Sequence, residues 1–171
     1  MKYSYVSQEV KNYKGSSIAK SETNDCFVRA FAAAADVDYD TAHSFVKKTF
    51  RRPDKKGTPN YQIIKTMAEL QQNGLTIGTR KYDVEVIAKP LLTNRYKLHG
   101  KIIDRQKTVK SFIKSLPKGN FIVCVSQHAF AVKDGVLIDN KGEEFRPTRK
   151  VDGAYKIVKP NLYGKQLQLW G

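Results

Sequence analysis

The stretch NFIVCVSQHAFAVKDGVLIDN (residues 120–140) carries the clearest β pattern in the chain and decides its fold class. It is rich in β-branched and aromatic residues, which favour strands. Asp134-Gly135 separates two of its runs. This dipeptide is typical of a two-residue hairpin, because a type I′ turn needs positive φ at both central residues. The stretch therefore predicts antiparallel strands, one of which starts at His128.

Helical periodicity comes earlier in the chain, where a helix is expected from about Asp25 to Ala35. Thr23, Asn24 or Asp25 can cap the start of this helix. Cys26 therefore lies in its first turn. The apolar face of the helix consists of Phe27, Ala30, Phe31 and Ala34.

Three more helices are expected, each behind a polar N-cap residue. One starts in DYDTAHSFVKKTF with Asp38 or Asp40 as its cap, and one lies in NYQIIKTMAELQQNG with Asn60 as its cap and Gly74 as its stop. The last lies near residues 108–116, in TVKSFIKSLPKG, with Thr108 as its cap.

After the third helix the hydrophobic period changes from 3.6 to 2. LTIGT (75–79), YDVEVIA (82–88) and GAYKIV (153–158) have the pattern of strands, whereas residues 89–107 carry no clear signal. Helices followed by antiparallel strands predict the α+β class.

The length of the chain fits one domain, because single cores commonly form from roughly 100 to 200 residues and this chain has 171. We expect a single domain over residues 1–171. Within it, residues 1–20 form a polar N-terminal arm that becomes ordered by packing on the domain. Residues 21–74 form a helical part, and residues 75–171 form a mainly β part.

The two cysteines, Cys26 and Cys124, make no disulfide framework. The N-terminal sequence has no apolar signal core, and no apolar run approaches the ~20 residues needed to cross a bilayer. We therefore expect no membrane partner and a reducing, cytoplasmic location. Together with three histidines, the cysteines lack the spacing of a metal site, so no metal and no cofactor are expected.

The net charge of +15 attracts anionic partners. Its densest segment is KKTFRRPDKK, which is either a nucleic-acid or anion site or a solvated surface. Tyrosine and basic residues also interleave in RKYD and NRYKLHGK, as they do in single-strand binders, although many basic domains share this pattern. The candidate anion-binding residues are Lys47, Lys48, Arg51, Arg52, Lys55 and Lys56.

Cys26 and His128 are the candidates for nucleophilic chemistry. A helix N-terminus lowers the pKa of a thiol, and a cysteine nucleophile also needs a base held by a third group. His43 lies inside the second helix and is expected on its surface, and His99 lies in the segment without a pattern. Against this hypothesis, Cys26 can be a small core residue and His128 a structural one. Cys124, in the run FIVCV, is expected to be buried.

The hairpin register identifies the third group. With a two-residue loop at Asp134-Gly135, alternation places His128 and Asp139 on the same face as diagonal neighbours. A three-residue loop would place Asn140 there instead. We favour Asp139, which can also simply end a strand.

The segments around Cys26 and around His128 and Asp139 resemble those of a known protein family. A cysteine at a helix head, a histidine at a strand start and a carboxylate one strand later, in NDCFVRAFAAA and HAFAVKDGVLIDN, resemble the papain-like cysteine peptidases. The match looks like the compact branch of that superfamily, which includes peptidase domains of bacteriocin-processing transporters and small papain-like proteins of bacteriophages. It covers about Thr23 to Asn140. The resemblance implies N-terminal helices, which carry Cys26, packed on a C-terminal antiparallel sheet, which carries His128 and Asp139.

In that family the cysteine attacks a carbonyl carbon, the histidine takes and returns the proton, and the Asp or Asn orients the ring. The resemblance gives these roles to Cys26, His128 and Asp139. Family members usually place an oxyanion-hole glutamine shortly before the cysteine, and AKSETNDC has none. The candidate donors are the Cys26 backbone N–H with Asn24, Thr23 or Ser21, and Gln127.

The resemblance therefore implies a peptidase or related thiol acyl-transfer hydrolase acting on a peptide or isopeptide bond. The basic surface leads us to expect an acidic segment in the substrate. The source is expected to be a bacterium or a bacteriophage, and the location the host cytoplasm or the virion. The alternative is a weakly active or inactive papain-like fold that serves as a basic virion-associated or nucleic-acid-binding protein.

Overall fold

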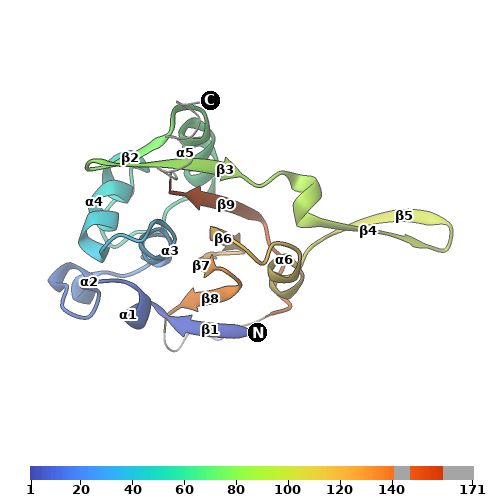
Figure 1. Cartoon of the computed structure of the whole chain (residues 1–171), viewed down its shortest axis with the longest axis horizontal. Helices are drawn as coiled ribbons and strands as arrows, with labels where there is room; N and C mark the ends of the chain where they lie inside the picture. The colour runs from blue at the N-terminus through green and yellow to red at the C-terminus, as the bar shows by residue number, and fades with distance from the viewer. Residues whose placement is uncertain (141–146, 160–171) are drawn as a thin grey trace, which may run out of the picture.

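The computed structural model describes residues 1–140 and 147–159, which form a mixed α+β structure. Residues 141–146 and 160–171, which were expected to belong to the same domain, lie outside the described residues. A seven-stranded sheet lies at the centre, in the order β1-β8-β7-β6-β9-β3-β2 (Figure 1). Its strands are β1 (Lys2–Tyr5), β2 (Leu75–Ile77), β3 (Arg80–Val86), β6 (Asn120–Val125), β7 (His128–Lys133), β8 (Val136–Asp139) and β9 (Gly153–Val158).

Helices surround this sheet, and a second sheet of two strands, β4 (Thr93–Leu98) and β5 (Lys101–Gln106), projects from the body as a ribbon (Figure 1). Over the described part of the chain, none of the helices has the length and apolar character that a bilayer crossing requires. The helices are α1 (Val6–Glu9), α2 (Ser17–Ser21), α3 (Cys26–Ala35), α4 (Tyr39–Thr49), α5 (Asn60–Asn73), the short 3-10 helix η1 (Lys89–Leu92) and α6 (Val109–Ser115).

The central strands are buried on both faces. On one face, Ile122 and Ala131 belong to the core that includes α3, α4 and α5. On the other face, Phe121 and Val123 pack in a second core with Phe112 of α6. This double burial explains why β6 has an unbroken apolar run instead of an alternating pattern.

Helix α3 packs against the centre of the first face. Every residue after Cys26 in this helix is buried, and Ala32 to Ala35 are each at most 1% exposed. Such small side chains allow the helix backbone to approach strands β6 and β7 closely. The alanine-rich segment is therefore an interior helix, and its packing fixes the position of its N-terminal residue.

The helix starts mostly agree with the sequence. Asp38, not Asp40, caps α4 by accepting a hydrogen bond from the Thr41 backbone N–H at 2.7 Å. Thr108 caps α6 as expected. The expected cap of α5 is wrong by one residue, because Pro59 occupies the N-cap position and its fixed φ leads the chain into the helix.

The expectation of a wholly C-terminal, antiparallel sheet is wrong at one edge. Residues 1–20 do pack on the domain, but they also form α1, α2 and strand β1, which pairs in parallel with β8. Val6 and Val10 anchor this segment in the core. β1 supplies partners for backbone groups at the edge of β8 that would otherwise be exposed.

The segment without a clear sequence pattern, residues 89–107, forms η1 and the β4–β5 ribbon. The ribbon residues are exposed on both faces except for Thr93 and Ile103, which are half-buried. A strand pair with no buried face has no alternation of apolar and polar residues to recognise, which explains the missing signal.

Asp25 precedes α3 but does not cap it with its side chain. Its buried carboxylate accepts hydrogen bonds from Arg29 Nη1 at 2.5 Å and from the Tyr39 hydroxyl at 2.7 Å. Burial, followed by the bond to Asp25, raises the pKa of Tyr39. The carboxylate therefore joins α3 to α4 and leaves the first-turn N–H groups of α3 uncapped.

Asp25→Ala is expected to lower the free energy of unfolding by about 3 kcal/mol or more, because it removes a buried carboxylate that pairs with the Arg29 guanidinium and accepts a hydrogen bond from the Tyr39 hydroxyl. Asp38→Ala is the matched control, since it removes a helix cap and should cost about 1 kcal/mol. Urea unfolding measures both. Equal losses would show that Asp25 acts only as a helix-end residue.

Candidate active site

His128 and Asp139 meet at one end of the sheet. His128 is the first residue of β7 and Asp139 the last residue of β8, and the strands pair through the expected two-residue loop at Asp134-Gly135. His128 Nε2 lies 2.7 Å from Asp139 Oδ2. Asn140, the alternative neighbour, accepts a hydrogen bond from the Tyr13 hydroxyl at 3.4 Å instead. The expected register is confirmed.

Cys26 is half-buried at the first position of α3. Its sulfur interacts with the His128 ring and the Ala129 backbone N–H at the start of β7. Burial raises the pKa of the Cys26 thiol. These two hydrogen bonds and the positive charges of His128 and Arg29 outweigh burial and leave the pKa below its ordinary value. The Cys26 thiol is therefore easier to ionise than a free cysteine.

His128 lies between the thiol and the carboxylate. Because Nε2 bonds Asp139, Nδ1 is the ring nitrogen left for the hydrogen bond with Cys26. Burial lowers the pKa of His128, but the hydrogen bonds to Asp139 and Cys26 and their negative charges outweigh burial and raise the pKa to about 9. A lowered thiol pKa and a raised imidazole pKa favour a thiolate–imidazolium pair near neutral pH.

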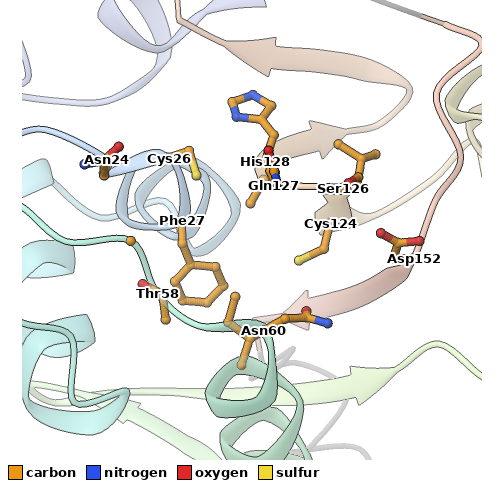
Figure 2. A pocket seen from close by; sticks show the side chains of 14 residues that line it. Asn24, Cys26, Phe27, Thr58, Asn60, Cys124, Ser126, Gln127, His128 and Asp152 are labelled. Atoms are coloured by element: carbon orange, nitrogen blue, oxygen red, sulfur yellow. The ribbon is translucent and has the colours of Figure 1, made fainter.

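A cleft of about 530 Å³ opens beside this pair. In Figure 2, Asn24 and Cys26 come from the start of α3, Gln127 and His128 from the β6–β7 side, and Asn60 from the start of α5. Across the described residues the cleft is lined by Asn24, Cys26, Phe27, Gly57, Thr58, Asn60, Ile63, Cys124, Val125, Ser126, Gln127, His128, Ala129 and Asp152.

Two of the expected oxyanion donors line this cleft. Asn24 adopts a left-handed φ of 54° and donates one amide hydrogen bond to the Lys55 carbonyl at 3.3 Å; the second N–H of the amide remains for a ligand. Gln127 is exposed in the β6–β7 turn. The hydroxyls of Thr23 and Ser21 donate to backbone carbonyls instead. Asn24 and Gln127 are therefore the better candidates, beside the uncapped amides of α3.

Glu22 holds the segment before Cys26 in place, and sequence reasoning missed it. Its side chain is only 3% exposed. Oε2 lies 2.6 Å from His43 Nε2 and accepts a hydrogen bond from Arg52 Nη1 at 3.0 Å, and Oε1 accepts one from the Lys55 backbone N–H at 2.6 Å. Burial raises the pKa of Glu22, but these bonds outweigh burial and lower the pKa to about 2. Glu22 thus joins the loop of residues 52–55 to the turn that precedes Cys26.

Two expectations about exposed residues are wrong for this reason. His43 is not on the helix surface but is 7% exposed, and Arg52 is 1% exposed. Arg52 bonds Glu22 and the Thr23 carbonyl, so it is not available to an external anion. Lys47 forms an ion pair with Asp54 at 2.9 Å. Of the six expected anion-binding residues, the exposed ones without such a partner in the described residues are Lys48, Arg51, Lys55 and Lys56.

Glu22, His43 and Asp54 could supply ligand atoms to a metal ion within the described residues. Arg52 Nη1 already occupies Glu22 Oε2, and Lys47 Nζ occupies Asp54. The Arg52 guanidinium and the Lys47 ammonium therefore already occupy the carboxylate oxygens that a metal ion would need. The group is an ion-pair network.

Thr58, Asp152 and Cys124 are among the cleft residues that were not singled out from the sequence as site residues. The Thr58 hydroxyl is buried and has no hydrogen-bond partner within residues 1–140 and 147–159. Asp152 is the one charged lining residue outside the Cys26–His128 pair in the same ranges. Cys124, expected to be buried, is buried, and burial raises its pKa to about 12. None of the three lies in a recognisable motif.

Comparisons with protein-family models, with curated proteins and with solved structures find no match to this chain.

Glu22→Gln is expected to lower the free energy of unfolding at pH 7 by about 3 kcal/mol, because it removes the charge partner of buried Arg52. The folded-state pKa of Glu22 is about 2, below the ordinary 4.5. The stabilisation by Glu22 is therefore complete above pH 4.5 and is lost as the pH falls through 2. The difference between wild type and variant in urea unfolding should shrink over this window.

Glu69→Gln is the control for this prediction, because Glu69 is an exposed residue of α5. It should change the free energy of unfolding by less than about 0.5 kcal/mol at every pH. A Glu22→Gln difference that does not vary with pH would contradict the assignment of a charged, paired Glu22.

Proposed function

We propose that this protein is a thiol-dependent acyl-transfer hydrolase of the papain-like type, acting as a cysteine peptidase on a peptide or isopeptide bond. One observation carries the proposal: His128 bonds Asp139 through Nε2 and interacts with Cys26 at the head of α3. A nucleophile, a base and an orienting group in this series are the parts that nucleophilic catalysis requires. The chain order of Cys26, His128 and Asp139, which resembles that of papain-like peptidases, supports the same hypothesis.

In the proposed mechanism the Cys26 thiolate attacks the carbonyl carbon of the substrate, and the carbonyl oxygen becomes an oxyanion. The backbone N–H groups at the start of α3, with Asn24 or Gln127, donate hydrogen bonds to that oxygen. The His128 imidazolium then gives its Nδ1 proton to the leaving amine, and the C–N bond breaks. This step leaves a thioester on Cys26.

Water completes the cycle. Neutral His128 takes a proton from a water molecule, which attacks the thioester carbonyl carbon, and the C–S bond breaks. The carboxylic acid leaves and the thiolate–imidazolium pair is restored. Asp139 keeps Nε2 occupied throughout, so that Nδ1 faces the sulfur and the imidazolium is stabilised.

The cleft favours a different substrate from the one that net charge suggested. Asp152 is its only charged residue besides the Cys26–His128 pair, counting the described residues alone. Gly57 and the Thr58 hydroxyl lie on the wall contributed by the loop before α5. A substrate side chain with a positive charge or a hydrogen-bond donor fits this lining better than an acidic one.

Iodoacetamide is expected to modify Cys26 about tenfold faster at pH 7 than a model cysteine peptide, because a larger fraction of the thiol is ionised. His128→Ala should bring the rate down to that of the peptide or below. Peptide mass mapping should find the label on Cys26 and not on buried Cys124. His99→Ala is the control, since His99 lies at the tip of the β4–β5 ribbon.

Hydrolysis of p-nitrophenyl acetate is expected to start with a burst of nitrophenolate that Cys26→Ala abolishes, because a thioester accumulates. Its pH profile should be bell-shaped, with the alkaline limb near 9, where His128 loses its proton. Asp139→Ala should move this limb to lower pH, because Asp139 helps to raise the His128 pKa. Equal reactivity in wild type, His128→Ala and a model thiol would exclude the proposed function.

A further inference from the structure

More than half of the net charge lies in one segment that the cleft does not use. Residues 87–120 contain nine lysine or arginine residues and one acidic residue, Asp104, so they hold +8 of the total +15. These residues form η1, the β4–β5 ribbon and α6. Of this charge, +3 lies on the β4–β5 ribbon, which projects from the body (Figure 1), and the rest lies on η1, α6 and the residues beside them at the base of the ribbon.

The β4–β5 ribbon leaves the body at a closed base, and most of its residues are exposed. Its base is closed by a hydrogen bond of 2.8 Å from the Lys107 backbone N–H to the Leu92 carbonyl. Its strands run for six residues each, which is about 20 Å at 3.4 Å per residue. Beyond this base two of its apolar side chains are left in solvent, since Leu98 is 44% and Ile102 64% exposed, and Ile103 is half-buried. A strand pair that adds so little to the core is available for binding.

Both faces of the ribbon carry positive charge. On one face, Lys101 and Arg105 accompany Tyr96, and the Arg105 guanidinium lies 5.6 Å from the centre of the Tyr96 ring. On the other face, Arg95 is paired with Asp104 at 2.8 Å. Lys97, next to Arg95 on that face, has no ion-pair partner in the described residues. Cations on two opposite faces suit a ligand with anionic walls on both sides.

Helix α6 continues this surface at the base of the ribbon. Asn94 of β4 donates a hydrogen bond to the Ser111 hydroxyl at 3.2 Å. Lys114 follows Ser111 by three residues and Lys110 precedes Lys114 by four, so all three share one side of the helix. Both lysines are exposed. The helix therefore offers further cations beside the point where the ribbon leaves the body.

We propose that the β4–β5 ribbon, with the exposed lysines of α6, binds duplex DNA, with the ribbon in the major groove. The major groove is about 12 Å wide and admits a two-stranded β-ribbon. Phosphates line both of its sides, which matches cations on both faces of the ribbon. A single strand would be expected to lie along one cationic face that carries several aromatic residues, and the ribbon has only Tyr96.

This placement differs from the segment of residues 47–56 that charge density in the sequence favoured. There, Arg52 is buried against Glu22 and Lys47 is paired with Asp54. The ribbon surface does not depend on Cys26, so DNA binding and thiol chemistry can be tested separately.

Fluorescence anisotropy with a labelled duplex of about 20 base pairs is the direct test. About six phosphate contacts predict that affinity falls by about 10³ between 50 and 200 mM salt. The triple variant Lys97→Gln, Lys101→Gln, Arg105→Gln should weaken binding at least about tenfold and make the log–log salt slope shallower by about 3. Thermal unfolding should be unchanged, because these side chains are exposed.

The matched control is the triple variant Lys48→Gln, Lys56→Gln, Lys65→Gln, which removes the same charge from exposed positions elsewhere. It should bind the duplex within about twofold of wild type, allowing for the weak effect of net charge at a distance. If the control loses as much affinity as the ribbon variant, net charge alone governs binding and the proposal is overturned.

A second variant removes the ribbon itself. Replacing residues 93–106 with Asn-Gly joins Leu92 to Lys107, whose backbone groups already bond each other. Duplex binding should be lost, while Cys26 should react with iodoacetamide at the wild-type rate. Retained binding, tighter binding of a single strand of the same sequence, or no binding by wild type at low salt would each overturn the proposal.

Discussion

The close packing of α3 on β6 and β7 is the constraint on which the proposed site depends. Ala32 to Ala35 are almost fully buried, so the helix is held against the sheet by backbone proximity and small side chains. This packing brings the N-terminal residue of α3, Cys26, to the point where β7 starts at His128. A larger side chain in this run would push the helix outward and separate the thiol from the imidazole.

Two buried carboxylates precede the thiol in the chain and carry out different tasks. Asp25 bonds Arg29 and Tyr39, so it ties α3 to α4 without using the first-turn N–H groups. Glu22 binds Arg52 and thereby fixes the loop that faces Asn24. The negative charge of each is matched by a guanidinium, and the electrostatic surroundings of Cys26 stay favourable to a thiolate.

Sequence reasoning succeeded where the interactions are local. Turn chemistry at Asp134-Gly135 and strand alternation were enough to place His128 beside Asp139. The Glu22–Arg52 pair joins residues 30 positions apart and leaves no periodic pattern. The β4–β5 ribbon has no buried face, and β1 is a four-residue edge strand, so hydrophobic alternation was absent from both. Charge density along the chain also could not show that Arg52 is buried or that Lys47 is paired with Asp54.

The parallel pairing of β1 with β8 has a consequence for synthesis of the chain. Tyr5 lies opposite Asp139. About 130 further residues must therefore be synthesised after β1 before its partner strand β8 exists. Cys26 is likewise translated about 100 residues before His128. Contacts of such long sequence separation form late, because loop closure must precede them. A nascent or incompletely folded chain therefore carries an ordinary thiol, and the reactive form arises only with the finished sheet.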